Sequence, residues 1–363
     1  MSPDEDADDT APEPSGHRAF GLIARALLFA GVFHFLVLPQ IGGTRKALGL
    51  LGGLNPWLLA GAAALEMLAL VSYAQLTRSL LPAKQRLGLW RMFRIVLSSL
   101  AVNHVVPGGA AAGGVLQYRL LTRSGVDTAR ASFAMATQSL GSALMLNVIL
   151  WIGLVVSIPT TGFQPLYATA AAVGAVLLAV AAFAVAALTR GRTRTMRVLA
   201  SLANRTPRLD ADRLTTAMGR AADQLTALGR EPRLAATAIG WAATNWLLDA
   251  AVLWLFIAAF GHQASIPGLL VAYGLANVLA AVPLSPGGLG VIETTLIVTL
   301  VGFGTPRATA SLGVAAYRIV QFWLPIPAGA VAWATLAGGR KRDALPAMVN
   351  DSRGGGAPSG AYS

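Results

Sequence analysis

Apolar stretches long enough to cross a bilayer recur along the chain, separated by short polar segments. A helix rises about 1.5 Å per residue, so about 20 apolar residues span the hydrocarbon core. Six continuous stretches have this length: Phe20–Leu38, Trp57–Thr77, Ala131–Ile158, Leu166–Leu188, Leu234–Phe260 and Ala308–Leu336. Two further stretches are interrupted: Leu89–Val106 resumes as Val115–Arg123, and Ile266–Val282 resumes as Val291–Phe303. The pattern predicts an all-α polytopic membrane protein with six full transmembrane helices and two re-entrant helical hairpins.

Both interruptions place glycine-rich backbone in the middle of an apolar region. The first contains Pro107-Gly108-Gly109 and Gly113-Gly114, and the second contains Gly287-Gly288 and Gly290 and ends at Glu293. Backbone without helical hydrogen bonds is tolerated at membrane depth where protein covers it or where it lines a water-filled cavity. An ionisable residue at that depth is a functional-site hypothesis by default. The two breaks are therefore the candidate functional elements of the chain.

Composition and charge placement agree with a membrane protein and set its orientation. The 363 residues are 55% hydrophobic and 12% charged, far less charged than a soluble domain. Lys and Arg gather beside alternate ends of the apolar stretches, above all in the basic loop 190–233, as expected of cytoplasmic segments. This distribution predicts cytoplasmic N- and C-termini in the cell membrane. It accounts for most of the net charge of +12 without a nucleic-acid partner, although some cations are expected to bind anionic lipid at the cytoplasmic surface.

Several classes of chemistry lack the residues they need. The chain has no cysteine, and its four histidines occur singly, never at metal-ligand spacing. We therefore expect no metal site and no cofactor. An acidic segment, 1–19, and a Gly/Ser-rich segment, 338–363, are predicted to be disordered tails on either side of a transmembrane domain at 20–337.

The two halves of the chain match at an offset of 179 residues. This offset sets Pro107-Gly108-Gly109 on Pro286-Gly287-Gly288, Gly125 on Gly304, and Glu66 opposite Asn245. The repeats would cover about 55–158 and 234–337. The placement of Lys and Arg predicts that the first hairpin enters from the cytoplasmic side and the second from the outer side, so the two halves form an inverted-topology repeat. Glycine-interrupted segments in corresponding positions of such repeats point to a transporter binding site.

The residues at the breaks suit an anionic head group. Each break is expected to deliver a helix N-terminus, at Val115 and at Val291, whose free N–H groups and dipole favour anions. The candidate substrate-binding residues are Gly108, Gly109, Gly113, Gly114, Arg119, Gly287, Gly288, Gly290, Glu293 and Arg318. Arg318 lies deep in the last span, where it needs a partner, and Glu293 is the natural one. Glu66 and Asp249 are further carboxylates at depth, available as counter-charges or proton carriers.

Structural interpretations of the same residues stay open. Glu293 can stabilise its own helix as a first-turn acid, and the Glu293–Arg318 pair can be a purely architectural clamp. Arg119 is close enough to the cytoplasmic end for its side chain to reach the head groups. The glycine pairs can simply let helices approach closely.

The C-terminal motif, with Pro283, Pro286-Gly287-Gly288, Gly290, Glu293 and Tyr317-Arg318, resembles the lysylphosphatidylglycerol synthase transmembrane-domain family. The first hairpin, with Asn103, Pro107 and Arg119, is similar to that family's first hairpin. The family includes YbhN-like, flippase-like membrane proteins, and the resemblance implies translocation of a phospholipid or glycolipid between leaflets. The sequence leaves no room for the soluble synthase domain, so synthase activity is not expected.

The leading hypothesis is therefore a lipid flippase-like transporter, not an enzyme. Alternatives are an integral membrane enzyme acting on lipid-linked sugar or phosphate, and a non-transporting scaffold that docks through the basic loop. The sequence leaves the lipid, the direction of transport, the coupling ion and the oligomeric state undetermined.

Overall fold

Four long helices frame the molecule. The computed structural model describes residues 55–106, 109–161, 231–280 and 285–336, with a few helical positions between 168 and 179. The long helices are α3 (Pro56–Ser79), α6 (Thr128–Thr161), α10 (Pro232–Ala259) and a continuous helix over Arg307–Leu336. That last helix consists of α13 (Arg307–Arg318), a π-helical turn η4 (Ile319–Trp323) and a final segment to Leu336. All four are long and apolar enough to cross a membrane.

The prediction of an all-α membrane protein is confirmed for these residues, which include no β-strand. Four of the six predicted full spans coincide with the four long helices. The predicted span Phe20–Leu38 lies outside the described residues, and so does most of Leu166–Leu188. The predicted tails and nearly all of the basic loop 190–233 also lie outside them.

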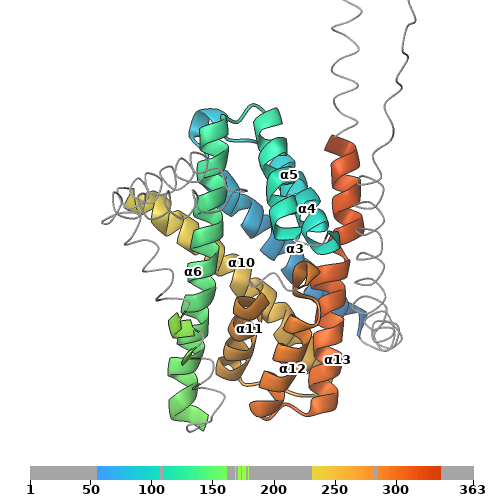
Figure 1. Ribbon diagram of the computed structural model, residues 1–363. Helices are drawn as coiled ribbons and strands as arrows, with labels where there is room; N and C mark the ends of the chain where they lie inside the picture. Colours follow the sequence, from blue (N-terminus) through green and yellow to red (C-terminus); the bar gives the residue numbers. More distant parts are fainter. Residues whose placement is uncertain are drawn as a thin grey trace, which may run out of the picture.

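Two pairs of shorter helices fill the space between the long ones (Figure 1). One pair is α4 (Leu89–Val105) and α5 (Gly109–Arg123), which pack against each other in the upper half of the view. The other is α11 (Ile266–Ala280) and α12 (Val291–Gly302), which pack against each other in the lower half. Two short 3₁₀ turns, η2 (Ala83–Gln85) and η3 (Pro286–Gly288), connect helices. In Figure 1 the end of α4 and the starts of α5 and α12, which border the two glycine-rich breaks, lie toward the middle of the molecule.

The predicted start of the second helix in the first pair is wrong. The sequence indicated a restart at Val115, whereas α5 begins at Gly109 and runs through the glycine-rich stretch. The three consecutive alanines at 110–112 explain the difference, because alanine has the highest helix propensity and offsets the cost of the neighbouring glycines. The predicted start of α12 at Val291 is confirmed.

The ends of α5 and α12 have the same local geometry, 179 residues apart. Gly125 has φ 90° and Gly304 has φ 89°, the left-handed conformation that ends a helix at low cost in glycine. Val126 N donates to Leu121 O at 3.2 Å, and Thr305 N donates to Leu300 O at 3.0 Å. The next long helix then begins at Thr128 in one half and at Arg307 in the other. Corresponding residues thus close corresponding turns.

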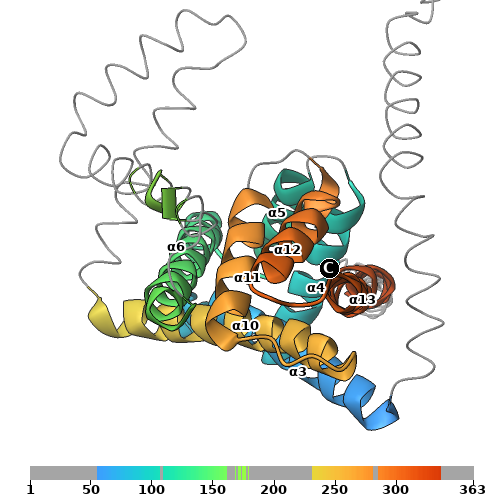
Figure 2. The ribbon, with the colours of Figure 1, turned by 90° about the horizontal axis from the view of Figure 1, so that it is seen from below.

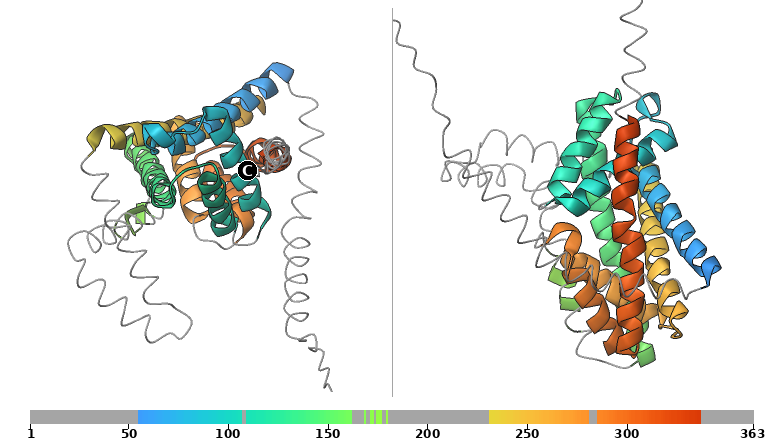
Figure 3. Two further views of the ribbon diagram at one scale, coloured as in Figure 1. Left: turned by 90° about the horizontal axis from the view of Figure 1, so that it is seen from above. Right: turned by 90° about the vertical axis from the view of Figure 1, so that its right-hand side faces the viewer.

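The described helices form two large apolar cores and a smaller third one, and α3 and α10 contribute to both large cores. These two helices lie side by side along one face of the molecule, with the short pairs on the other face (Figure 2; Figure 3, left). One large core gathers mainly residues of α3 to α6, with a few from α10 and the last helix, and includes Met92, Ile95 and Leu121. The other gathers mainly residues of α10 to α13, with single residues of α3 and α6, and includes Phe256 and Leu296. The α3–α10 contact therefore joins the two halves, and polar groups buried there lie between them.

Candidate functional site

The second break is a tight turn held by its own side chains. Gly287, Gly288 and Gly290 all have positive φ, between 55° and 83°. Gly290 is the N-cap of α12, and its N–H donates to Glu293 Oε2 at 2.7 Å. Ser285 Oγ donates to Leu289 O at 2.7 Å. One carboxylate oxygen of Glu293 therefore caps the helix that follows the break.

Arg318 binds the same turn from the last long helix. Its Nε donates to Glu293 Oε1 at 2.6 Å, and its Nη2 donates to Gly287 O at 3.3 Å. Nη1 donates to Gln321 Oε1 at 2.8 Å, and the guanidinium lies 4.4 Å from the centre of the Phe322 ring. Arg318 is only 4% exposed, and each of its three side-chain nitrogens has a protein acceptor. Glu293 is thus the partner that the sequence predicted, and the pair clamps the break to the last span.

The end of α4 reaches this clamp. His104 Nδ1 donates to Phe322 O at 3.0 Å, since a carbonyl can only accept, and the two rings stack with centroids 4.3 Å apart. Phe322 belongs to the π-helical turn, where Leu324 N donates to Ile319 O five residues back. A Cβ on Gly287 would lie 3.3 Å from His104 Cδ2. The two breaks, far apart in sequence, therefore come together.

At the first break, two of the glycines serve helix packing. A Cβ on Gly109 would collide with Asn103 O, and one on Gly113 would lie 2.6 Å from Ser99 O, both on α4. Neither position has room for a side chain, so these glycines let α5 pack directly on the backbone of α4. Gly114 differs, because its nearest neighbour would be Met135 Cε at 3.8 Å. Gly114 has open space in front of it.

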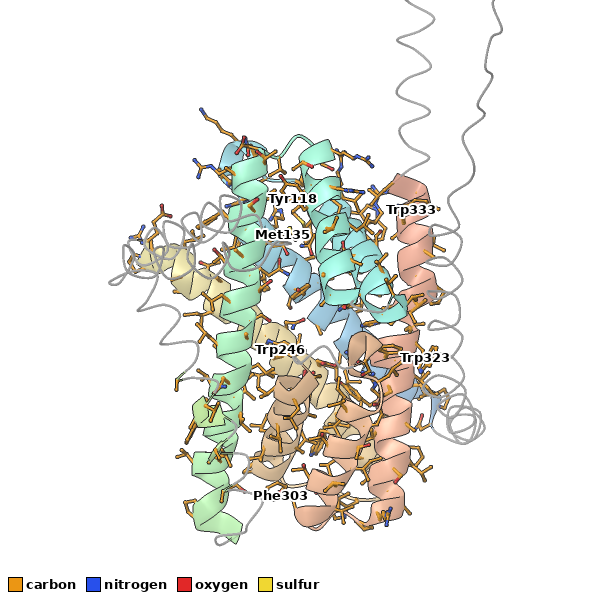
Figure 4. The ribbon with its side chains drawn as sticks, viewed as in Figure 1. Tyr118, Met135, Trp246, Phe303, Trp323 and Trp333 are labelled. Carbon is orange, nitrogen blue, oxygen red and sulfur yellow. The ribbon has the colours of Figure 1, made fainter. Side chains whose placement is uncertain are left out.

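That space is a cavity of about 200 Å³ between α3, α4, α5 and α6. Gly113, Gly114 and Met135 line part of it. The lining residues with amide or hydroxyl side chains are Tyr73, Ser99, Asn103, Gln117, Gln138 and Ser139. In Figure 4, Met135 on α6 lies beside α5 in the upper half of the molecule. Amides and hydroxyls thus line a cavity inside an otherwise apolar bundle.

The cavity wall is fixed by a small hydrogen-bond network. Thr77 Oγ1 donates to Gln138 Oε1 at 2.7 Å, and Gln117 Nε2 approaches the same oxygen at 3.4 Å. All three side chains are buried. Buried polar groups that are paired hold one geometry, so this wall of the cavity is pre-formed.

The two adjacent glycines of α5 offer a direct test of this packing. Gly113→Ala should lower the melting temperature of the detergent-solubilised protein, because its methyl group would overlap the α4 backbone and overpacking costs about 1–3 kcal/mol. Gly114→Ala, with ordinary contact distances, should leave the melting temperature unchanged or slightly raised. Equal shifts for both variants would contradict the packing described here.

The other residues that the sequence predicted for the site do not all lie near the two breaks. Glu66 on α3 and Asp249 on α10 are buried and lie together at the junction of the two halves. Arg119 is exposed on α5 and is not among the partners of Glu293 or Arg318. Gly108 lies outside the described residues.

Tyr273 and Tyr317, which bind Asp249, were not singled out as site residues from the sequence. Tyr317 directly precedes Arg318 in the second motif, and that adjacency was the available signal.

These features define a multi-pass, all-helical membrane protein whose two glycine-broken helix pairs meet beside a polar cavity. The family described as the lysylphosphatidylglycerol synthase TM region matches residues 22–329, and the chain belongs to this family. The resemblance noted in the sequence is confirmed.

Three curated relatives match shorter segments. A UPF0104 membrane protein of Methanothermobacter thermautotrophicus is 31% identical over 94 residues, 26% of this chain and 28% of the relative. An uncharacterised protein of Synechocystis is 35% identical over 91 residues, 24% and 27% of the two chains. The inner membrane protein YbhN of Escherichia coli is 28% identical over 82 residues, which are 23% of this chain and 25% of the relative. The chain thus matches about a quarter of the length of each relative, and two of the three names describe membrane proteins.

Proposed function

We propose that the protein is a lipid flippase-like transporter that moves a phospholipid or glycolipid head group between leaflets, and that it is not an enzyme. The observation that carries this proposal is the polar cavity beside the meeting point of two glycine-broken helix pairs. In this proposal the pairs are re-entrant hairpins, inserted from opposite sides between six full spans, and both termini are cytoplasmic. Rocking one repeat against the other would expose the cavity to each leaflet in turn.

The cavity meets the main energetic need of such a transporter. A head group that enters hydrocarbon loses its hydration, which costs several kcal/mol for each polar group without a replacement partner. Amide and hydroxyl side chains around the cavity supply such partners. Ala110 and Ser139 are both exposed and line the cavity, so the lipid tails can stay in the bilayer while the head group enters.

The first turn of α5 supplies the anion-binding element. The N–H groups of a helix's first turn have no intrahelical acceptor and carry the positive end of the helix dipole. α5 starts at Gly109, and Ala110, Gly113 and Gly114 line the cavity. A lipid phosphate there would lie against the start of the helix, with the hydroxyl groups of the head group toward Gln117 and Gln138. Glu293 on the second hairpin and Arg318 on the last long helix would together hold the tip of that hairpin in place.

A second, larger pocket supports the proposed contact with anionic lipids at the cytoplasmic surface. It has a volume of about 830 Å³ and lies between the ends of α3, α5, α6 and α10. Arg86 and Arg130 supply positive charge, while Leu80, Leu81 and Phe133 supply apolar contacts. Cationic groups close to a membrane surface attract anionic lipids by about 1 kcal/mol each.

Reconstitution in liposomes tests the transport proposal. We expect the wild-type protein to speed the exchange between leaflets of labelled phosphatidylglycerol, of a labelled glycolipid, or of both, relative to protein-free liposomes. Gly114→Leu, which fills the cavity, should slow that exchange at least about tenfold, which corresponds to about 1.4 kcal/mol of barrier.

The matched control is Gly240→Leu, at an exposed position of α10 where no described residue lies within 4 Å of the added atom. It should transport like the wild type. If the wild type moves none of these lipids faster than empty liposomes, the proposal fails. If Gly114→Leu and Gly240→Leu transport at the same rate, the cavity beside Gly114 is not the transport site.

A further inference from the structure

Two carboxyl groups meet where the two halves of the molecule join. Glu66 on α3 is 5% exposed, and Asp249 on α10 is 6% exposed. Their side chains are hydrogen-bond neighbours of each other. The offset of the repeat had set Asn245 opposite Glu66, but Asp249, one turn further along α10, is the residue that faces it.

One oxygen of Asp249 is fully engaged by tyrosines from two other helices. Tyr273 Oη on α11 donates to Asp249 Oδ2 at 2.5 Å, and Tyr317 Oη on α13 donates to the same oxygen at 3.0 Å. Both tyrosines are almost completely buried, and the Tyr273 ring packs edge-on against Trp246. The Trp246 Nε1 donates to Ser142 on α6, which fixes this wall of the cluster (Figure 4).

One oxygen of each carboxyl group has no such donor among the described residues. Glu66 Oε2 and Asp249 Oδ1 are buried, and neither receives a hydrogen bond from an N–H or O–H group of the described residues. A buried carboxylate oxygen without a donor costs several kcal/mol, and this arrangement has two of them in adjacent carboxyl groups. A proton shared between the carboxyl groups supplies the missing donor.

The charges around the pair support a single shared proton. Two ionised carboxylates about 4 Å apart repel each other by about 4 kcal/mol at the effective dielectric of a protein, so such pairs retain one proton. The cation that faces Asp249 is Arg318 on α13, which is already paired with Glu293 on α12. Among the described residues, Tyr273 on α11 and Tyr317 on α13 bind the pair directly, and the α6 residue bound to the neighbouring Trp246 is the uncharged Ser142.

We propose that Glu66 and Asp249 form a proton-binding site that holds one proton in this conformation and releases it when the two halves move apart. A proton suits the site better than a divalent cation, which takes six or more oxygen ligands, because the two carboxyl groups offer only two buried oxygens without a donor among the described residues. Within the described residues, no group of three or more His, Cys, Asp or Glu side chains lies close enough to hold a metal.

The position of the pair links the proton to movement between the halves. Glu66 belongs to the first repeat, whereas Asp249 and both tyrosines belong to the second. A rocking motion that separates α3 from α10 would part the carboxyl groups and let water hydrate each of them, which favours release of the proton. The coupling rests on the transport function proposed above, but binding of the proton does not.

Infrared spectroscopy of the purified protein tests the binding site without transport. At neutral pH the wild type should show the carbonyl band of one protonated carboxyl, shifted by exchange into heavy water. Glu66→Gln and Asp249→Asn should each lose this band, because the amide then donates to the remaining carboxylate. Tyr317→Phe should shift the band without removing it, and Glu231→Gln, at an exposed position, should leave it unchanged. If the wild type has no such band, or if Glu66→Gln and Asp249→Asn both keep it, the inference is wrong.

Transport with a pH difference across the liposome membrane then tests the coupling. The wild-type rate should change several-fold when the sign of the pH difference is reversed, and the rate of Glu66→Gln should not. Transport that is insensitive to pH, or that depends on sodium instead, would overturn the coupling and leave the transport function standing. If no lipid moves at all, the transport function fails, and the infrared band alone decides the proton site.

Discussion

Arg318→Met should lower the free energy of unfolding by about 3–5 kcal/mol, the usual cost of removing one partner of a buried ion pair. Methionine keeps an apolar chain against Phe322 but donates no hydrogen bonds. Glu293 Oε1 and Gly287 O would each lose the donor that now satisfies them. Chemical denaturation of the detergent-solubilised protein, followed by tryptophan fluorescence, measures the change.

A double-mutant cycle with Glu293→Gln separates the ion pair from general damage to the fold. The amide oxygen introduced by Glu293→Gln can still accept a hydrogen bond from Gly290 N, so the cap of α12 survives. The double variant should be clearly more stable than the sum of the two single effects predicts, because it leaves no unpaired charge. The clamp would be contradicted if the two single effects simply added up in the double variant, or if Arg318→Met cost less than about 1 kcal/mol. Removing one partner of a buried ion pair costs more than this.

The sequence was a good guide to the helices because membrane spans need long apolar runs and glycine or proline breaks them. Four predicted spans coincide with long helices, and α12 begins at the predicted residue, where Gly290 caps it and Glu293 lies in the first turn. The Glu293–Arg318 pair was predictable for a similar reason. A cation deep in a span must find an anion, and Glu293 was placed to meet it.

Contacts between helices were much harder to predict. The repeat set Glu66 opposite Asn245, but which side chains face each other depends on how far two packed helices are rotated about their axes. Asp249 lies one turn further along the same helix, and it is the residue that meets Glu66. The π-helical turn at Ile319–Trp323 was missed as well, because no residue pattern in this segment distinguishes it from a regular helix.

The roles of the first-break glycines could not be separated from sequence either. Gly113 and Gly114 are neighbours of the same type, yet successive residues of a helix point about 100° apart. Both border the cavity, but Gly113 also lies against the α4 backbone, whereas Gly114 has only Met135 Cε near its added atom. The same rotation leaves Arg119 exposed on α5, away from the clamp that the sequence had grouped it with.

Gly287→Ala is expected to destabilise the protein through two independent effects. A residue with a side chain pays about 1–2 kcal/mol for the left-handed backbone that Gly287 adopts at φ 55°. Its Cβ would also overlap Phe322 Cε2, and an overpacked contact of this kind costs about 1–3 kcal/mol. Thermal denaturation should therefore place this variant well below the wild type.

Gly304→Ala isolates the first effect, because Gly304 has φ 89° and no residue in the described part of the chain lies within 4 Å of the added atom. It should cost less than Gly287→Ala, and Phe322→Leu should recover part of the difference by making room. If Gly287→Ala and Gly304→Ala are equally stable, the contact between the break and Phe322 is not tight. A clear difference would mean that the second break is held in one shape by its neighbours, through the same ring that stacks on His104. Movement of either glycine-rich break would then have to displace the other.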